Sequence, residues 1–141
     1  MRPIQRYKTS RMWNINANIV AADVVSTAMT ALIIEVIQKS LLSRSALIAT
    51  TAIIDGAISL FVFAGLHYFA NQNRGVKDVV RVQIHRWMLS PLHYLLASGL
   101  QYVLLGMGVE VGLSVLVAYL LAVIVCRLLH TLYGHKRGLF E

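Results

Sequence analysis

The sequence has little of what a soluble domain or a disulfide-linked secreted domain needs. Charged residues make up only 13% of its 141 residues, whereas soluble globular domains have roughly a quarter. Cysteine occurs once, at Cys126, which excludes an internal disulfide and a cysteine metal cluster. Only six residues are acidic and two are proline. The remainder is apolar, with 57% hydrophobic residues and a mean hydropathy of +0.66, as in membrane proteins.

The net charge of +7 would favour nucleic-acid binding in a soluble protein. Here the basic residues lie beside long apolar runs, where they set the orientation of the chain and contact anionic lipid. We therefore expect anionic membrane lipids as partners and no nucleic acid.

Four apolar runs divide the chain, at about residues 15–37, 46–69, 88–105 and 111–132. Each is near the 20 residues that cross a bilayer core as a helix, the only open-chain structure whose backbone groups are all paired in lipid. The sequence therefore predicts an all-α, polytopic membrane protein whose single domain, residues 1–141, has four transmembrane helices.

The connectors predict how these helices pair. Residues 38–45 and 106–110 are short enough to join only antiparallel neighbours, whereas residues 71–86 are longer, polar and basic. We therefore predict two tandem helical hairpins joined by a basic loop.

The distribution of lysine and arginine predicts the orientation. Cytoplasmic segments carry an excess of basic residues near the span ends. One side of the predicted topology has eleven lysine and arginine residues, and the other side has only Lys39 and Arg44. The prediction is that both termini are cytoplasmic (N-in/C-in). The eleven are Arg2, Arg6, Lys8, Arg11, Arg74, Lys77, Arg81, Arg86, Arg127, Lys136 and Arg137.

The second and fourth runs end alike. Leu66-His67 is followed seven residues later by Arg74-Gly75, and Leu129-His130 is followed seven residues later by Arg137-Gly138. The identical spacing suggests an internal duplication of one hairpin, related by an axis along the membrane normal. The alternative is that basic and aromatic residues recur at any cytoplasmic helix end.

Asn73-Arg74 and Lys136-Arg137-Gly138-Leu139-Phe140, at the ends of the two hairpins, carry a resemblance to a known family. In layout and in these residues the chain resembles the GtrA-like family of small four-span membrane proteins. It lacks the glycine pair and the tryptophans of that family. The resemblance implies a protein of the bacterial inner membrane that passes or presents polyprenyl-phosphate-linked sugars.

Two ionisable residues at similar predicted depth are candidates for the site. Asp23 lies about eight residues into the first span and Arg127 about six residues before the end of the fourth. Because charges inside a span are costly, we expect an ion pair between them. If the pair has a function, Arg127 binds a phosphate head group and releases Asp23 as it does so. The alternative is that the pair is structural and only fixes the rotation of the helices. Three further arginines would form a basic cytoplasmic collar for phosphate: Arg74, Arg86 and Arg137.

Asp55 is a separate candidate, because it lies near the middle of the second span beside Gly56 and hydroxyl-bearing residues. We expect a neutral, protonated carboxyl group there, because burial in apolar surroundings disfavours the charged form. The functional alternative is a proton or cation coupling site.

His67, His93 and His130 all fall near the cytoplasmic boundary, on three different predicted helices. Three histidines at one level could bind a metal, and His67 with His130 could ligate a haem or another pigment. The alternative is that they are interfacial residues whose rings reach toward water.

The sequence contains no nucleophile with its base, no glycine-rich phosphate loop and no paired carboxylates of glycosidase type, so we expect no enzyme. The expected function is to translocate or present an anionic, lipid-linked substrate. The main alternative is an accessory or assembly subunit of a larger membrane complex, and a homo-oligomer is also open. No cofactor is assigned.

Overall fold

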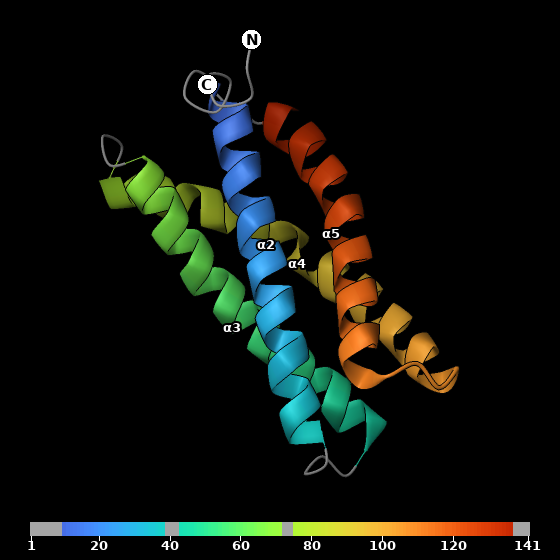
Figure 1. Cartoon of the computed structure of the whole chain (residues 1–141). Helices are drawn as coiled ribbons and strands as arrows, with labels where there is room; N and C mark the ends of the chain where they lie inside the picture. Colours follow the sequence, from blue (N-terminus) through green and yellow to red (C-terminus); the bar gives the residue numbers. More distant parts are fainter. Residues whose placement is uncertain (1–9, 39–42, 72–74, 137–141) are drawn as a thin grey trace.

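The computed structural model describes residues 10–38, 43–71 and 75–136. These residues form four long helices, drawn in Figure 1, and each is long and apolar enough to cross a membrane. The prediction of an all-α protein with four candidate spans is therefore confirmed. The helices are α2 (Arg11–Ile37), α3 (Arg44–Ala70), α4 (Gly75–Gly106) and α5 (Val111–Lys136).

The four helices form one bundle. Helix α2 packs against α3 and α5, and α4 packs against the same two helices. The first turn of α2 and the last turn of α5 lie at the same end of the bundle (Figure 1). The tight turn between α4 and α5, which contains Gly108 at a φ of 81°, lies toward the other end.

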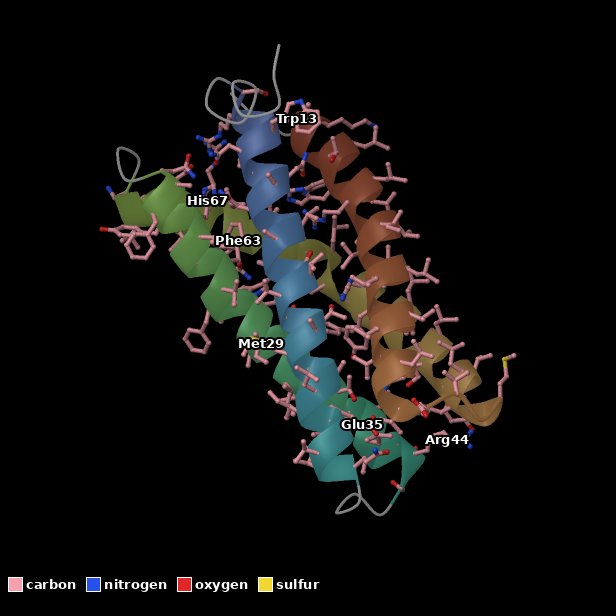
Figure 2. The ribbon with its side chains drawn as sticks, viewed as in Figure 1. Trp13, Met29, Glu35, Arg44, Phe63 and His67 are labelled. Carbon is pink, nitrogen blue, oxygen red and sulfur yellow. The ribbon has the colours of Figure 1, made fainter. Side chains whose placement is uncertain are left out.

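The surface is apolar and much of the interior is polar, the reverse of a soluble domain. Leu32, Val36 and Phe61 are more than 70% exposed, and Figure 2 shows side chains extending outward along the whole length of the bundle. An apolar exterior suits a lipid environment, where polar groups turn toward neighbouring helices. The buried polar side chains include Asn14, Asn18, Ser26, Thr27, Thr30, Thr51, Asp55, Ser59, Gln101 and Ser114.

Two apolar clusters lie at different heights in the bundle. One contains Ile15, Ile19, Ala22, Phe63 and Val82, and the other contains Ala31, Ile34, Leu47, Ala97, Val115, Ala118, Tyr119 and Ala122. On α2, Asp23 and Ser26 fall between the two clusters, and on α3 Asp55 and Ser59 do the same. The apolar clusters therefore enclose a polar layer at the middle of the bundle.

Helix α4 differs most from the sequence-based prediction. It begins at Gly75, whereas we expected a basic loop at residues 71–86 and a helix from about Met88. Its first turns are amphipathic: Val76, Val80 and Ile84 form an exposed apolar stripe at i, i+4 spacing. A prediction from continuous hydropathy misses such a segment, because polar residues alternate with the apolar ones. Arg86 therefore lies inside a helix and not at the end of a loop.

Pro91 lies within α4. Proline lacks the amide donor that would bond four residues back, and its ring displaces the preceding turn. Figure 1 shows α4 changing direction midway along its length, behind α2. The hydroxyl of Ser90, next to the proline, donates to the carbonyl oxygen of Arg86 at 3.2 Å. The bend is therefore adjacent to the polar layer.

Candidate functional site

A cavity of about 40 Å³ lies in the polar layer, and all four helices line it. Its volume has room for only a few water-sized groups. Two carboxylates and two guanidinium groups face the same small space inside the bundle. The lining residues are Asp23, Asp55, Ser59, Arg86, Leu89, Ser90, His93, Tyr94, Cys126 and Arg127.

Asp23 of α2 pairs with Arg86 of α4. The Arg86 Nη2 atom lies 2.8 Å from the Asp23 Oδ1 atom, and the two side chains are 10% and 14% exposed. The expected ion pair between Asp23 and Arg127 is therefore wrong, although both residues line the cavity. Depth along the helices placed Asp23 and Arg127 at one level, but the helical continuation of α4 brings a closer cation to the carboxylate.

Ser59 of α3 completes this contact. Its hydroxyl donates to Asp23 Oδ1 at 2.9 Å and accepts from Arg86 Nη2 at 2.8 Å. The Arg86 guanidinium also lies over the ring of Phe63, with 4.6 Å between the carbon atom and the ring centroid, an attractive cation–π geometry. Arg86 is thus held by α2, α3 and its own neighbour Gln83, which accepts from Nη1 at 3.1 Å.

Arg127 of α5, unlike Arg86, has buried donors without a partner in the described part of the chain. Its Nε and Nη1 atoms are buried, and among the residues that the structure describes neither has a hydrogen-bond acceptor. A guanidinium group presents five N–H donors in a fixed fork and keeps its charge. A buried donor without an acceptor is costly. Arg127, which lines the cavity, therefore has two unused donors.

Arg127 also lines a second space, an apolar groove of about 360 Å³ between α2 and α5. The polar residues at the groove are Asn16, Thr131 and Arg127, and the Asn16 amide donates to the Thr131 hydroxyl at 3.2 Å. The remaining lining residues are apolar: Val20, Val123, Ile124 and Leu128. One guanidinium group thus borders both a polar cavity and an apolar groove.

Asp55 of α3 has only neutral partners. It is 3% exposed, its Oδ1 accepts from the Ser26 hydroxyl at 3.0 Å, and its Oδ2 accepts from the Tyr94 hydroxyl at 3.4 Å. Within the described segments no lysine or arginine forms an ion pair with it. The close approach of Tyr94 depends on Gly56, because a Cβ atom there would lie 2.9 Å from the Tyr94 hydroxyl oxygen.

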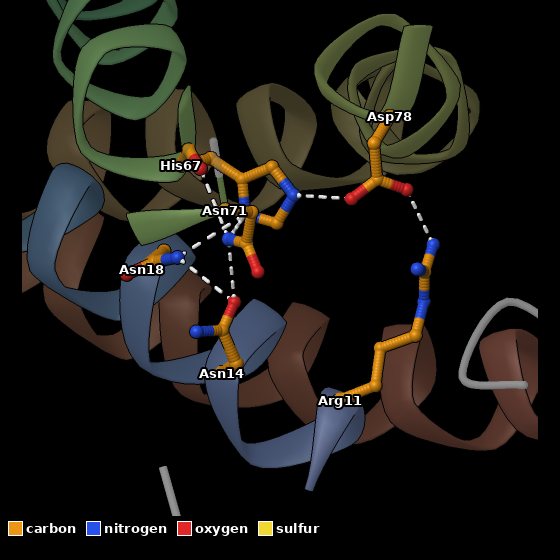
Figure 3. Close-up of polar contacts among 6 residues, drawn as sticks. All are labelled: Arg11, Asn14, Asn18, His67, Asn71 and Asp78. Carbon is orange, nitrogen blue, oxygen red and sulfur yellow. Dashed lines mark hydrogen bonds and ion pairs between the residues drawn. The ribbon is translucent and has the colours of Figure 1, made fainter. Parts of the chain in front are cut away.

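His67 belongs to a separate network near the first turns of α2 and α4, shown in Figure 3. Its Nε2 atom lies 3.1 Å from Asp78 Oδ2, and Asp78 also pairs with Arg11. Its Nδ1 atom lies 3.1 Å from the amide nitrogen of Asn18. The Asn71 amide group nearby donates to the His67 carbonyl oxygen at 2.9 Å. Amide nitrogens only donate, so Nδ1 accepts a hydrogen bond. Nε2 then carries the ring proton and donates a hydrogen bond to Asp78.

The three histidines of the expected metal or haem site are not brought together as a ligand group. Both ring nitrogens of His67 face protein partners. The His93 ring contacts the rings of Tyr94 and Tyr119 edge-on, at centroid distances of 5.0 and 5.8 Å. His130 is buried on α5. Across residues 10–38, 43–71 and 75–136, no group of three or more histidine, cysteine, aspartate or glutamate side chains could hold a metal ion.

Two candidates of the basic collar, Arg74 and Arg137, lie outside the described residues. The third, Arg86, lines the cavity. Ser59 was expected among the hydroxyl-bearing residues that could bond to Asp55, but it bonds to Asp23. Ser26 and Tyr94, which hold Asp55, were given no role toward a carboxylate. Asp55 and Ser59 share one face of α3 because they are four residues apart.

No family model, curated protein or solved structure matches this chain. The resemblance to the GtrA-like family therefore stays a hypothesis.

Proposed function

We propose that this chain is a non-enzymatic membrane protein that binds an anionic, lipid-linked molecule of the polyprenyl-phosphate-sugar class and presents or translocates it. The observation that carries the proposal is the pair of buried, unused donors on Arg127 at the junction of the cavity and the groove. An arginine inside a membrane-spanning helix is costly, so it is a candidate ligand contact by default.

The charge arrangement favours an anion as the ligand. Asp23 is occupied by Arg86, and Asp55 has hydroxyl partners, so neither carboxylate pairs with Arg127. A phosphate oxygen can accept a charge-assisted hydrogen bond from a guanidinium N–H, and such bonds are the strong ones. A phosphate at the Nε edge would therefore give that unused donor the acceptor that the protein does not supply.

The groove favours a lipid as the carrier of that anion. Its wall is formed by α2 and α5, and it offers about 360 Å³ of mainly apolar space that meets Arg127. A hydrocarbon chain lying in the groove would bring a phosphate at its end to the guanidinium group. The cavity behind it, about 40 Å³, is too small for a sugar. The described conformation therefore suits presentation of the head group, and translocation requires α2 and α5 to separate.

The proposal includes the location of the protein. We propose the bacterial inner membrane, which the resemblance to the GtrA-like family implies. We propose that both termini are cytoplasmic, which the eleven-to-two distribution of basic residues favours. The two hairpins, α2 with α3 and α4 with α5, are proposed to derive from one duplicated unit. What supports this is the equal spacing of the Leu-His and Arg-Gly pairs.

A binding measurement tests the proposal. The protein is placed in nanodiscs of zwitterionic phosphatidylcholine, and farnesyl methyl phosphate is titrated in. This probe is a phosphodiester with a single fixed charge, and farnesyl methyl ether is its neutral counterpart. We expect the phosphodiester to bind and the ether to bind weakly. Arg127→Ala should weaken phosphodiester binding by about 10- to 100-fold, because it removes charge-assisted hydrogen bonds.

Two further variants make the result specific. Arg127→Lys keeps the charge but loses the fork of donors, and it should recover only part of the affinity. Arg81→Ala removes an exposed arginine of α4 outside the cavity and should bind as the wild type does. Equal affinity for the phosphodiester and the ether, or an Arg127→Ala variant that binds normally, would contradict the proposal.

A further inference from the structure

We propose that Asp55 takes up one proton when the anion binds, so that each anion enters the cavity together with a proton. This inference rests on the proposed function, since it concerns the same cavity. It assigns a coupling role to a carboxyl group that the binding of phosphate by Arg127 does not itself use.

The charged side chains that line the cavity balance one another before an anion binds. Four formal charges line it, Asp23 and Asp55 against Arg86 and Arg127, and they sum to zero when all are ionised. A bound phosphodiester adds one negative charge to a space enclosed by apolar clusters. Uncompensated charge in such surroundings is costly, since Coulomb energies grow as the effective dielectric constant falls. One proton taken up by a lining carboxylate restores the balance.

The partners of the two carboxylates decide which one takes the proton. Asp23 already pairs with the Arg86 cation at 2.8 Å. Asp55 has two hydroxyl partners and no cation within ion-pair distance among the described residues. Protonating Asp23 would break an ion pair, whereas protonating Asp55 breaks none.

Ser26 can form a hydrogen bond with Asp55 whether the carboxyl group is ionised or protonated. Its hydroxyl oxygen lies 3.0 Å from Asp55 Oδ1 and 3.1 Å from the backbone carbonyl oxygen of Asp23. With Asp55 ionised, the hydroxyl donates to the carboxylate. With Asp55 protonated, the carboxylic acid donates to the Ser26 oxygen and the hydroxyl donates to the carbonyl. Both patterns leave the Ser26 hydroxyl and the Asp55 carboxyl group hydrogen-bonded to each other, so the proton can enter without moving the helices.

Several other titratable or charged groups face Asp55 from the packed helices, and His93 is the one that could compete for the proton. Its ring contacts two phenol rings edge-on and makes no hydrogen bond to the described residues. An imidazolium needs two acceptors, so His93 is less suited to hold the charge. The groups are Asp23 on α2, Arg86, His93 and Tyr94 on α4, and Tyr119, Cys126 and Arg127 on α5.

The coupling has a consequence for translocation. An anion that moves with one proton carries no net charge across the membrane. The membrane potential then neither drives nor opposes the transfer, whereas a bare anion would be subject to it. The proton gradient across the membrane then drives the transfer of the anion together with its proton.

Isothermal titration calorimetry with farnesyl methyl phosphate in phosphatidylcholine nanodiscs tests the inference. Titrations in two buffers of different ionisation enthalpy give the number of protons taken up for each probe bound. We expect uptake that approaches one proton in the wild type at the pH where it is greatest. Because binding then consumes a proton, the dissociation constant should rise with pH, by up to about tenfold per unit.

Variants identify the group that takes up the proton. Asp55→Asn should still bind but take up no proton, with an affinity independent of pH. A His93→Gln variant that lost the proton uptake would overturn the assignment to Asp55. Glu110→Gln, which changes an exposed carboxylate at the α4–α5 turn, is the matched control and should behave as the wild type. An infrared difference spectrum of the wild type should also show a protonated-carboxyl band appearing on binding, a readout that does not depend on the folding of any variant.

The outcomes separate the two proposals. Binding of the phosphodiester without proton uptake, or uptake that Asp55→Asn retains, overturns the inference and leaves the proposed function standing. A wild type that does not bind the phosphodiester overturns the proposed function and this inference with it.

Discussion

Arg86 on α4 donates to the Asp23 carboxylate on α2 across the middle of the bundle, with 2.8 Å between Nη2 and Oδ1. The two residues come from different hairpins, and Ser59 on α3 bonds to both. This contact holds three helices together at the level where the cavity lies. It also leaves Arg127 without the carboxylate that its depth would assign to it.

Removing Arg86 should destabilise the bundle strongly. Arg86→Ala leaves the Asp23 carboxylate buried without a cation, a change that costs about 3 to 5 kcal/mol for buried pairs. The free energy of unfolding in detergent micelles measures it. The double variant Asp23→Leu with Arg86→Leu should recover much of the loss, because no unpaired charge remains. Additive effects of the two single changes would show that the residues do not interact.

Asp78 should hold the first turns of α4 in place. It pairs with Arg11 on α2 and accepts from His67 on α3, and its side chain is 9% exposed. Asp78→Ala removes hydrogen bonds to a charged group, so backbone amides of residues 75–86 should exchange about tenfold faster or more. Hydrogen exchange with mass spectrometry measures this. Amides near the α4–α5 turn serve as the internal control, and equal acceleration there would mean that the whole bundle had loosened.

Glu35 should act as a cap for α5. Its Oε2 atom accepts from the backbone N–H of Gly112, in the first turn of α5, at 2.8 Å. First-turn amides have no partner within their own helix, and a carboxylate also complements the positive end of the helix dipole. We expect Glu35→Ala to lower the free energy of unfolding by about 1 kcal/mol. Glu35→Gln keeps an acceptor and should lower the free energy of unfolding by less. A larger loss for Gln than for Ala would argue against capping.

The proposed topology is open to a labelling test. Cys126 is the only cysteine and is buried, so Cys126→Ala provides a cysteine-free background. New cysteines are then placed at Met107, which is 74% exposed in the α4–α5 turn, and at the exposed Lys136. In bacterial cells a membrane-impermeant maleimide should label position 107 directly and position 136 only after permeabilisation. The reverse pattern would contradict the N-in/C-in orientation.

The sequence predicted three of the helices closely because long apolar runs leave little choice of structure in a membrane. Helices α2, α3 and α5 lie within a few residues of the expected runs. The first turns of α4 were missed because an amphipathic segment has no continuous apolar run. That single error moved Arg86 from an expected loop end into the interior of the bundle.

The candidate site could be predicted in part for a related reason. Counting residues along a span gives depth, and depth correctly placed Asp23 and Arg127 in one layer. Depth does not give the face of the helix, which turns by about 100° per residue. The pairing of Asp23 with Arg86 depends on that rotation and on the extended start of α4, and neither is visible in hydropathy. The same holds for Ser26, whose two contacts arise from two helices.

The central claim is that Arg127 meets the phosphate of a lipid-linked anion, and nuclear magnetic resonance of the guanidinium group tests it most directly. The protein is labelled with ¹⁵N-arginine, and the Nε–H signal of Arg127 is assigned by its absence in Arg127→Lys. Saturation with farnesyl methyl phosphate should shift this signal, because the buried Nε donor gains an acceptor. Farnesyl methyl ether should leave it in place. A phosphodiester that binds while the Arg127 signal stays unchanged would contradict the account.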